Sequence, residues 1–192
     1  MVQNKNAKVI DRRQFIKTST AAGASLILAP HVLTGAKSFG VDDINVALLG
    51  AGAQGQVLMN ACLKIPGIRF KAVCDIWKEY NQKRVYRLLG KYGHKLNAYE
   101  DYRKMLENEK DLDAVIVATP DFWHAEHATA CLEAGLNVYC EKEMSNTLEG
   151  AKQVVRAAKK SGKLLQVGHQ RRSNPRYIHC YEKLIKEAKI LG

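Results

Sequence analysis

Six residues from Gly50 to Gly55 read Gly-Ala-Gly-Ala-Gln-Gly, which is the spacing of a dinucleotide-binding turn. In such a turn the first glycine permits a tight bend and the second lets the backbone approach a pyrophosphate. The third allows a helix to pack closely on a strand. The N–H groups and positive dipole end of that helix then face the phosphates. We therefore predict dinucleotide contacts at Gly50, Gly52, Ala53, Gln54 and Gly55.

An acidic residue, Asp75, ends an apolar run about 20 residues after this turn, where a carboxylate hydrogen-bonds the adenosine ribose. A carboxylate repels a 2′-phosphate, and Ile76 and Trp77, which follow, carry no positive charge. The sequence therefore predicts NAD rather than NADP, with Asp75 and Ile76 at the cofactor. The alternative is a glycine turn in an unrelated α/β protein.

Two further pairs of residues follow apolar runs, Thr119-Pro120 and Glu141-Lys142. Ligands bind at the carboxyl ends of strands in open α/β sheets, so these side chains are candidates for the same cleft. A lysine beside a reacting hydroxyl polarises it, or takes part in proton transfer if burial lowers its pKa. The alternative for Lys142 is a surface side chain paired with Glu141.

The elements that must position these residues alternate regularly along the chain. Apolar runs of strand length alternate with amphipathic stretches of helix length, which predicts an α/β fold with a doubly wound parallel sheet of the Rossmann type. Thr147 is a candidate N-cap and Gly162 lies just beyond the end of that helix. The predicted strands are 44–49, 69–74, 114–118, 137–140 and 164–167, and the predicted helices are 56–65, 78–89, 123–133, 147–160 and 175–188.

The chain has 30 basic and 19 acidic residues, a formal charge of +11. The basic residues are interspersed with acids, and no recognition helix, zinc spacing or aromatic RNA-binding motif is present, so we expect no nucleic-acid partner. We also expect no metal site, because His124 and His127 lack a clear third ligand. The five cysteines form no C-x-x-C pair, which disfavours a disulfide framework and favours folding in a reducing compartment.

Residues 1–36 differ from the rest of the chain. Arg12-Arg13 precede a weakly apolar run of about 12 residues, which is too short to span a bilayer. The segment resembles a twin-arginine export signal, which a receptor in the export machinery reads. This predicts a periplasmic or otherwise exported protein without stable membrane insertion, folded around its cofactor before export. The alternative is a basic tail on a cytoplasmic protein.

From Ile44 to its end the chain resembles the glucose–fructose oxidoreductase/inositol dehydrogenase family (Gfo/Idh/MocA). The resemblance rests on the glycine turn, on Ala118-Thr119-Pro120 with His124, on Glu141-Lys142, and on the segment Gly-His-Gln-Arg-Arg at 168–172. It implies an NAD-binding domain over 41–170, with residues 171–192 beginning a second α/β domain that is missing from this chain. On that reading this piece binds cofactor without a finished active site.

The resemblance also assigns roles. It implies that His124 and Gln170 lie at the cofactor, that Glu141 fixes its loop, and that Lys142 lies beside the nicotinamide and the substrate. The alternative for His124 is a residue at the start of a helix whose ring forms its hydrogen bonds with backbone groups. Arg171 and Arg172 are candidates to orient an oxygen-rich substrate, or else form a solvated basic turn. The family usually has proline after Glu-Lys, whereas this chain has Glu143, which removes a backbone constraint and adds a charge beside Lys142.

We therefore expect the NAD-binding part of an oxidoreductase that transfers a hydride between NAD and a sugar or cyclic polyol, with Lys142 as the catalytic contributor. We expect the full-length protein to be a homo-oligomer. One alternative is an exported glycosidase that uses tightly bound NAD for transient oxidation and elimination. The other is an NAD-binding module without catalytic activity.

Overall fold

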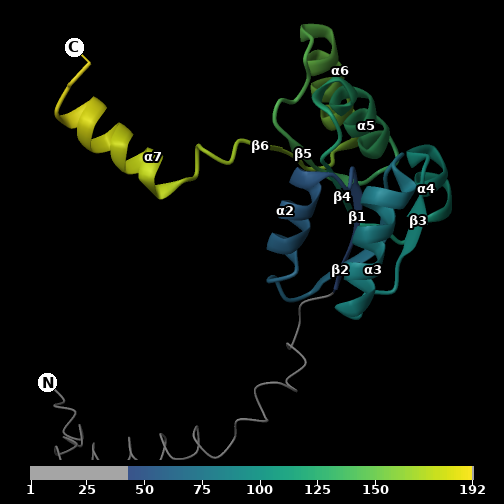
Figure 1. The fold of residues 1–192 in the computed structure, drawn as a ribbon. Coiled ribbons are helices and arrows are strands. Elements are labelled where there is room, and N and C mark those ends of the chain that lie inside the picture. The colour runs from purple at the N-terminus through teal and green to yellow at the C-terminus, as the bar shows by residue number, and fades with distance from the viewer. Residues whose placement is uncertain (1–42, 192) are drawn as a thin grey trace, which may run out of the picture. The chain divides into compact units, whose positions relative to one another are not determined.

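The computed structural model describes residues 43–191, so the predicted leader at 1–36 lies outside the described part of the chain. The described residues form one parallel six-stranded sheet in the order β3-β2-β1-β4-β5-β6, with helices in the connections (Figure 1). This confirms the doubly wound Rossmann fold. The strands are β1 (Ile44–Leu49), β2 (Ile68–Cys74), β3 (Asn97–Tyr99), β4 (Ala114–Val117), β5 (Asn137–Glu141) and β6 (Leu165–Gly168).

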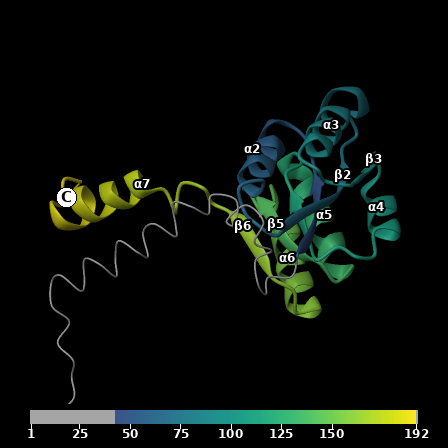
Figure 2. The same ribbon diagram turned by 90° about the horizontal axis from the view of Figure 1, so that it is seen from below.

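Helices cover both faces of the sheet, with α2 and α3 on one side and α6 on the other (Figure 2). The α-helices are α2 (Ala53–Cys62), α3 (Lys83–Lys91), α4 (Tyr102–Asn108), α5 (Asp121–Glu133), α6 (Leu148–Ser161) and α7 (Pro175–His179). Two π-helical segments, η1 (Lys78–Gln82) and η2 (Cys180–Glu187), lead into α3 and continue α7. No helix within residues 43–191 combines the length and the apolar character needed to cross a membrane.

The core has two layers because alternate residues of a strand point to opposite faces. Val46 and Leu48 of β1 pack with residues of α2 and α3, such as Met59 and Leu89. Ala47 and its neighbours on the other face pack with residues of α4, α5 and α6. The central strands are buried on both faces and are therefore almost wholly apolar.

Some elements differ from their predicted limits. Strand β3 and helix α4 were not predicted, because β3 has only three residues and α4 only seven. Helix α2 begins at Ala53 rather than at residue 56, since the glycine turn leads directly into it. The N-cap of α6 is confirmed: Thr147 Oγ1 accepts the Gly150 N–H at 3.1 Å, and Gly162 ends the helix with φ +67°.

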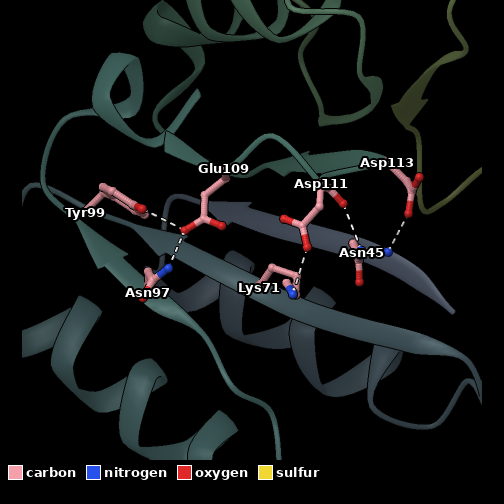
Figure 3. A network of polar contacts seen from close by, with 7 residues as sticks. All are labelled: Asn45, Lys71, Asn97, Tyr99, Glu109, Asp111 and Asp113. Atoms are coloured by element: carbon pink, nitrogen blue, oxygen red, sulfur yellow. Dashed lines mark hydrogen bonds and ion pairs between the residues drawn. The ribbon is translucent and has the colours of Figure 1, made fainter. Parts of the chain in front are cut away.

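A polar network holds the segment between α4 and β4 to residues of β1, β2 and β3 (Figure 3). Glu109, which is buried, accepts hydrogen bonds from Tyr99 Oη and Asn97 Nδ2, each at 2.7 Å. Lys71 pairs with Asp111 at 2.9 Å, and Asn45 Nδ2 donates to the Asp111 carbonyl at 2.9 Å. None of these side chains belongs to the predicted site, although the Tyr99 carbonyl oxygen accepts the Asp75 N–H at 3.0 Å, so the network stabilises the fold beside the site.

Candidate nucleotide-binding site

Parallel pairing brings the predicted site residues to one edge of the sheet. Leu49, the last residue of β1, is in register with Cys74 of β2 and with Val117 of β4. Glu141 of β5 is in register with Gly168 of β6. The loops that follow these strand ends carry the glycine turn, Asp75, Thr119-Pro120, Lys142 and Gln170.

The three glycines of the turn have different surroundings. Gly50 has φ +95°, and a Cβ atom there would lie 2.6 Å from the carbonyl carbon and oxygen of Ala118. A Cβ atom on Gly55 would collide with the Gly50 carbonyl oxygen. At Gly52, by contrast, a Cβ atom would meet no atom of the described chain within 4 Å. Gly50 and Gly55 are therefore required by packing, whereas the open space at Gly52 leaves room for a ligand.

The amino end of α2 suits an anion. Gly52 is its N-cap, no side chain caps the helix, and no acidic residue lies in its first turn. The N–H groups of a first helical turn have no partner within the helix, and they add to the positive end of its dipole. This end of α2 is therefore compatible with a pyrophosphate held by backbone N–H groups.

Asp75 links β2 to the glycine turn. Its Oδ2 atom accepts the Ala51 N–H and its Oδ1 atom accepts the Trp77 N–H, each at 2.7 Å. Asn81 Nδ2 lies 3.4 Å from Oδ2. A carboxylate has about four acceptor positions, so Asp75 retains capacity for ribose hydroxyl groups. The Asp75 side chain is therefore held in place and can still accept hydrogen bonds from a ribose.

A cavity of about 630 Å³ opens beside the turn and Asp75. Six of the predicted cofactor residues line it: Gly50, Gly52, Asp75, Ile76, Thr119 and Pro120. The remaining predicted site residues, Ala53, Gln54, Gly55, His124, Glu141, Lys142, Gln170 and Arg171, lie outside the lining of this cavity. A cavity of this size accommodates a nucleoside portion of a dinucleotide.

The sequence did not point to the aromatic wall of the cavity, which includes Trp123, His127 and Tyr102. The His127 ring stacks on Trp123 at a centroid distance of 5.4 Å and meets Tyr102 edge-on at 4.6 Å. Burial lowers the pKa of His127 from 6.5 to about 4, so the ring is neutral at pH 7. The available signal was the i, i+4 spacing of Trp123 and His127 on one helix face directly after Thr119-Pro120.

His124 lies in the interior and is only 1% exposed. Its Nε2 atom is 2.7 Å from the Thr119 carbonyl oxygen, and its Nδ1 atom is 2.6 Å from the Glu143 carbonyl oxygen. The structure therefore agrees with the alternative in which backbone groups satisfy this histidine.

Glu141 is buried and connects the turn to the far half of the sheet. Its Oε1 atom accepts from Gln54 Nε2 at 2.9 Å and from Tyr139 Oη at 3.4 Å. Its Oε2 atom accepts the Lys142 N–H at 3.1 Å. A Cβ atom on Gly168 would collide with Tyr139 Oη, so glycine at this position makes room for the arrangement.

Lys142 projects from the segment after β5 and is half exposed. Its Nζ atom lies 3.8 Å from Glu143 Oε1, so its ion pair is with the residue that follows and not with Glu141. The Lys142–Glu143 peptide bond is cis. Gln170 is exposed in the turn after β6, and Arg171 donates to Tyr177 Oη of α7 at 2.6 Å.

Three of the five cysteines act as small core residues. Cys74, Cys131 and Cys140 are buried, and burial raises the pKa of each thiol to about 12. Within residues 43–191, no group of three His, Cys, Asp or Glu side chains is arranged to hold a metal ion.

Residues 44–169 match the model of a protein family described as an oxidoreductase family with an NAD-binding Rossmann fold (Gfo/Idh/MocA). The chain is 33% identical over 147 residues to the inositol 2-dehydrogenase/D-chiro-inositol 3-dehydrogenase of Shouchella clausii, covering 75% of this chain and 41% of that protein. It is 29% identical over 175 residues to a glycosyl hydrolase family 109 protein of Shewanella baltica, and the match covers 80% of this chain and 38% of that protein. The chain thus spans about two fifths of the length of these curated relatives.

Among solved structures, an NAD-binding oxidoreductase from Klebsiella pneumoniae superposes with a TM-score of 0.59 at 25% identity. The match covers 75% of this chain and 39% of that one.

Proposed function

Because the chain belongs to the Gfo/Idh/MocA oxidoreductase family with an NAD-binding Rossmann fold, we propose that it is the cofactor-binding part of a dehydrogenase that transfers a hydride between NAD and a sugar or cyclic polyol. The observation that carries this proposal is the open turn at Gly52, which adjoins a cavity lined by Asp75. The relative that acts on inositol, a cyclic polyol, supports the substrate class.

The chain's own residues have separate tasks in this proposal. The backbone from Gly50 to Gly55 holds the pyrophosphate, and Asp75 accepts the hydroxyl groups of the adenosine ribose. The wall of Trp123 and His127 excludes water from the adenosine side of the cavity. Ala53, Gln54, Ile76, Thr119, Pro120 and Gln170 remain proposed cofactor contacts.

NAD supplies the hydride acceptor or donor when it is bound. Lys142 is the proposed residue at the reacting hydroxyl group, where its ammonium group polarises the oxygen or exchanges a proton with it. Arg171 is the proposed contact to an oxygen-rich substrate. Residues 171–192 would then begin the substrate domain, and the reaction belongs to the longer protein.

The first experiment measures binding of NAD and NADP to the full chain by isothermal titration calorimetry. Because Asp75 repels a 2′-phosphate, we expect NAD to bind at least about tenfold more tightly than NADP. Asp75→Asn removes the charge but keeps a side-chain oxygen, and we expect it to reduce this preference. Equal affinity of the wild-type chain for the two cofactors would contradict the assignment of Asp75.

The resemblance to the family 109 glycosyl hydrolase favours a second candidate, a glycosidase that retains NAD through each turnover. The two candidates differ in their redox balance. A dehydrogenase accumulates NADH in proportion to the substrate oxidised, whereas a glycosidase of this type releases sugar without net NADH. Incubation of the longer protein with polyols and with glycosides, with both products measured, therefore distinguishes them.

We also propose export through the twin-arginine pathway, on the basis of Arg12-Arg13 and the short apolar run that follows. Changing both arginines to lysine retains the charge but alters the motif that the receptor reads. We expect this double variant to remain in the cytoplasm while the wild type is recovered from the periplasm. Equal export of the two proteins would contradict the proposal.

A further inference from the structure

Two histidines of α5 hold the same residue, Thr119. His124 Nε2 lies 2.7 Å from the Thr119 carbonyl oxygen, and His127 Nδ1 lies 3.0 Å from Thr119 Oγ1. The two histidines are three residues apart and therefore share a face of the helix. Thr119, which lines the cavity, is thus held at two atoms by two side chains.

Only one of these histidines also reaches the segment after β5. His124 Nδ1 lies 2.6 Å from the carbonyl oxygen of Glu143, which is 19 residues further along the chain. Lys142, the neighbour of Glu143, is half exposed, so its position depends mainly on its backbone. That backbone is held before Lys142 by Glu141, which accepts the Lys142 N–H, and after it by His124.

We propose that His124 is a positioning residue that fixes the Lys142 segment against the loop of Thr119. His124 is 1% exposed, so it acts through its neighbours rather than by direct contact with the ligand. Loss of the His124 ring affects its two neighbours unequally. His127 still holds Thr119, whereas the Glu143 carbonyl loses its side-chain partner. The inference rests on the proposed function, in which Lys142 lies at the nicotinamide end of bound NAD.

Two substitutions separate the two contacts of the ring. In His124→Asn the side-chain amide nitrogen takes about the place of Nδ1 and retains a donor toward Glu143. In His124→Gln the amide nitrogen takes about the place of Nε2 and retains a donor toward Thr119. Thr129→Val is the matched control, because Thr129 is a buried residue of the same helix whose hydroxyl has no hydrogen-bond partner among the described residues.

The probes are ADP-ribose, which lacks nicotinamide, and NADH, each titrated into the full chain by calorimetry. For the wild type, His124→Asn and Thr129→Val, we expect NADH to bind more tightly than ADP-ribose. For His124→Gln we expect NADH to lose roughly tenfold in affinity, to the level of ADP-ribose, while ADP-ribose binding stays within about threefold of the wild type. This split distinguishes positioning of the Lys142 segment from a general loss of structure.

Several results would overturn the inference. These are equal behaviour of His124→Asn and His124→Gln, parallel loss of both ligands in His124→Gln, and a wild type that binds NADH no better than ADP-ribose. Failure of the wild type to bind ADP-ribose would instead refute the proposed function. If the His124 variants do not fold, hydrogen–deuterium exchange of the wild type decides: NADH, but not ADP-ribose, must slow exchange in residues 141–147.

Discussion

Gln54 Nε2 donates a hydrogen bond to Glu141 Oε1 over 2.9 Å, although the two residues are 87 positions apart in the chain. Gln54 belongs to the glycine turn and lies in the first turn of α2, and Glu141 ends β5. The bond therefore ties the proposed pyrophosphate site to the strand that carries Lys142. It also gives a buried carboxylate one of its neutral donors, which a charged group in the interior requires.

We expect substitutions in this pair to destabilise the domain and to be coupled. Gln54→Ala removes one donor and should lower the free energy of unfolding by about 1 kcal/mol. Glu141→Gln introduces an N–H group among donors and should cost about 1–3 kcal/mol. Urea denaturation of both single variants and the double variant measures the coupling, with Asn60→Ala, an exposed position of the same helix, as the control. Strictly additive costs would mean that the bond contributes nothing.

Substitutions at Gly50 and Gly52 should separate effects on folding from effects on NAD binding. A Cβ atom at Gly52 meets open space, so Gly52→Ala should retain the wild-type melting temperature while the added methyl group weakens NAD binding by roughly tenfold or more. Gly50→Ala forces φ +95° on an alanine and places its Cβ against Ala118, so we expect a destabilised chain. Thermal melts and calorimetry on the same samples provide the comparison.

Gly90→Ala is the matched control for the glycine variants. Gly90 lies inside α3 with open space around a Cβ atom, and alanine there should stabilise the helix by about 1 kcal/mol without affecting NAD. Unchanged NAD affinity in Gly52→Ala would contradict a pyrophosphate at this turn.

His127 should make stability depend on pH in a defined window. Its pKa in the folded chain is lowered from 6.5 to about 4 because burial disfavours the charged ring. Between these values the unfolded chain binds a proton that the folded chain does not. The contribution of His127 to stability is therefore complete above pH 6.5 and is lost as the pH falls toward 4.

His127→Phe keeps an aromatic ring beside Trp123 and cannot titrate. We expect urea denaturation to show a flatter fall of stability between pH 6.5 and 4 in this variant, with a difference of up to about 3 kcal/mol across the window. The other titratable groups are common to both proteins, so the comparison is between the two slopes of stability against pH. Identical slopes would show that folding does not lower the pKa of His127.

The network around Glu109 should affect stability alone. Glu109→Ala leaves Tyr99 Oη and Asn97 Nδ2 without their shared acceptor, which should lower the free energy of unfolding by about 1–3 kcal/mol. NAD affinity should change little, since Asn97, Tyr99 and Glu109 do not line the cavity. Glu107→Ala, at an exposed position of α4 two residues before Glu109, should have little effect on either quantity. A large loss of NAD affinity in Glu109→Ala would contradict this separation.

The elements that the sequence predicted well are those whose own residues determine them. Residues 114–117 form a strand because four successive apolar residues are stable only when both faces are covered. Thr147 caps α6 through a bond to Gly150, three residues away. The edge strand β3 carried no such signal, because two of its three residues are exposed and it is held by pairing with β2.

The candidate site also has parts that local sequence determines and parts that depend on packing. The spacing of three glycines and Asp75 predicted the turn and its acidic neighbour, since both follow from one strand–helix–strand unit. Tyr102 could not be grouped with Trp123 and His127 from the sequence, because it meets His127 only when α4 and α5 pack on the same face of the sheet.

The sequence by itself determined the fold class, the position of the glycine turn and the acid that follows it. The reason is that hydrophobic periodicity and glycine spacing act over a few residues. Only the tertiary structure decided that Glu141 bonds to Gln54 and that His124 lies between two carbonyl groups. These contacts join loops that the sheet brings to one edge, and their geometry depends on how whole elements pack rather than on any local pattern.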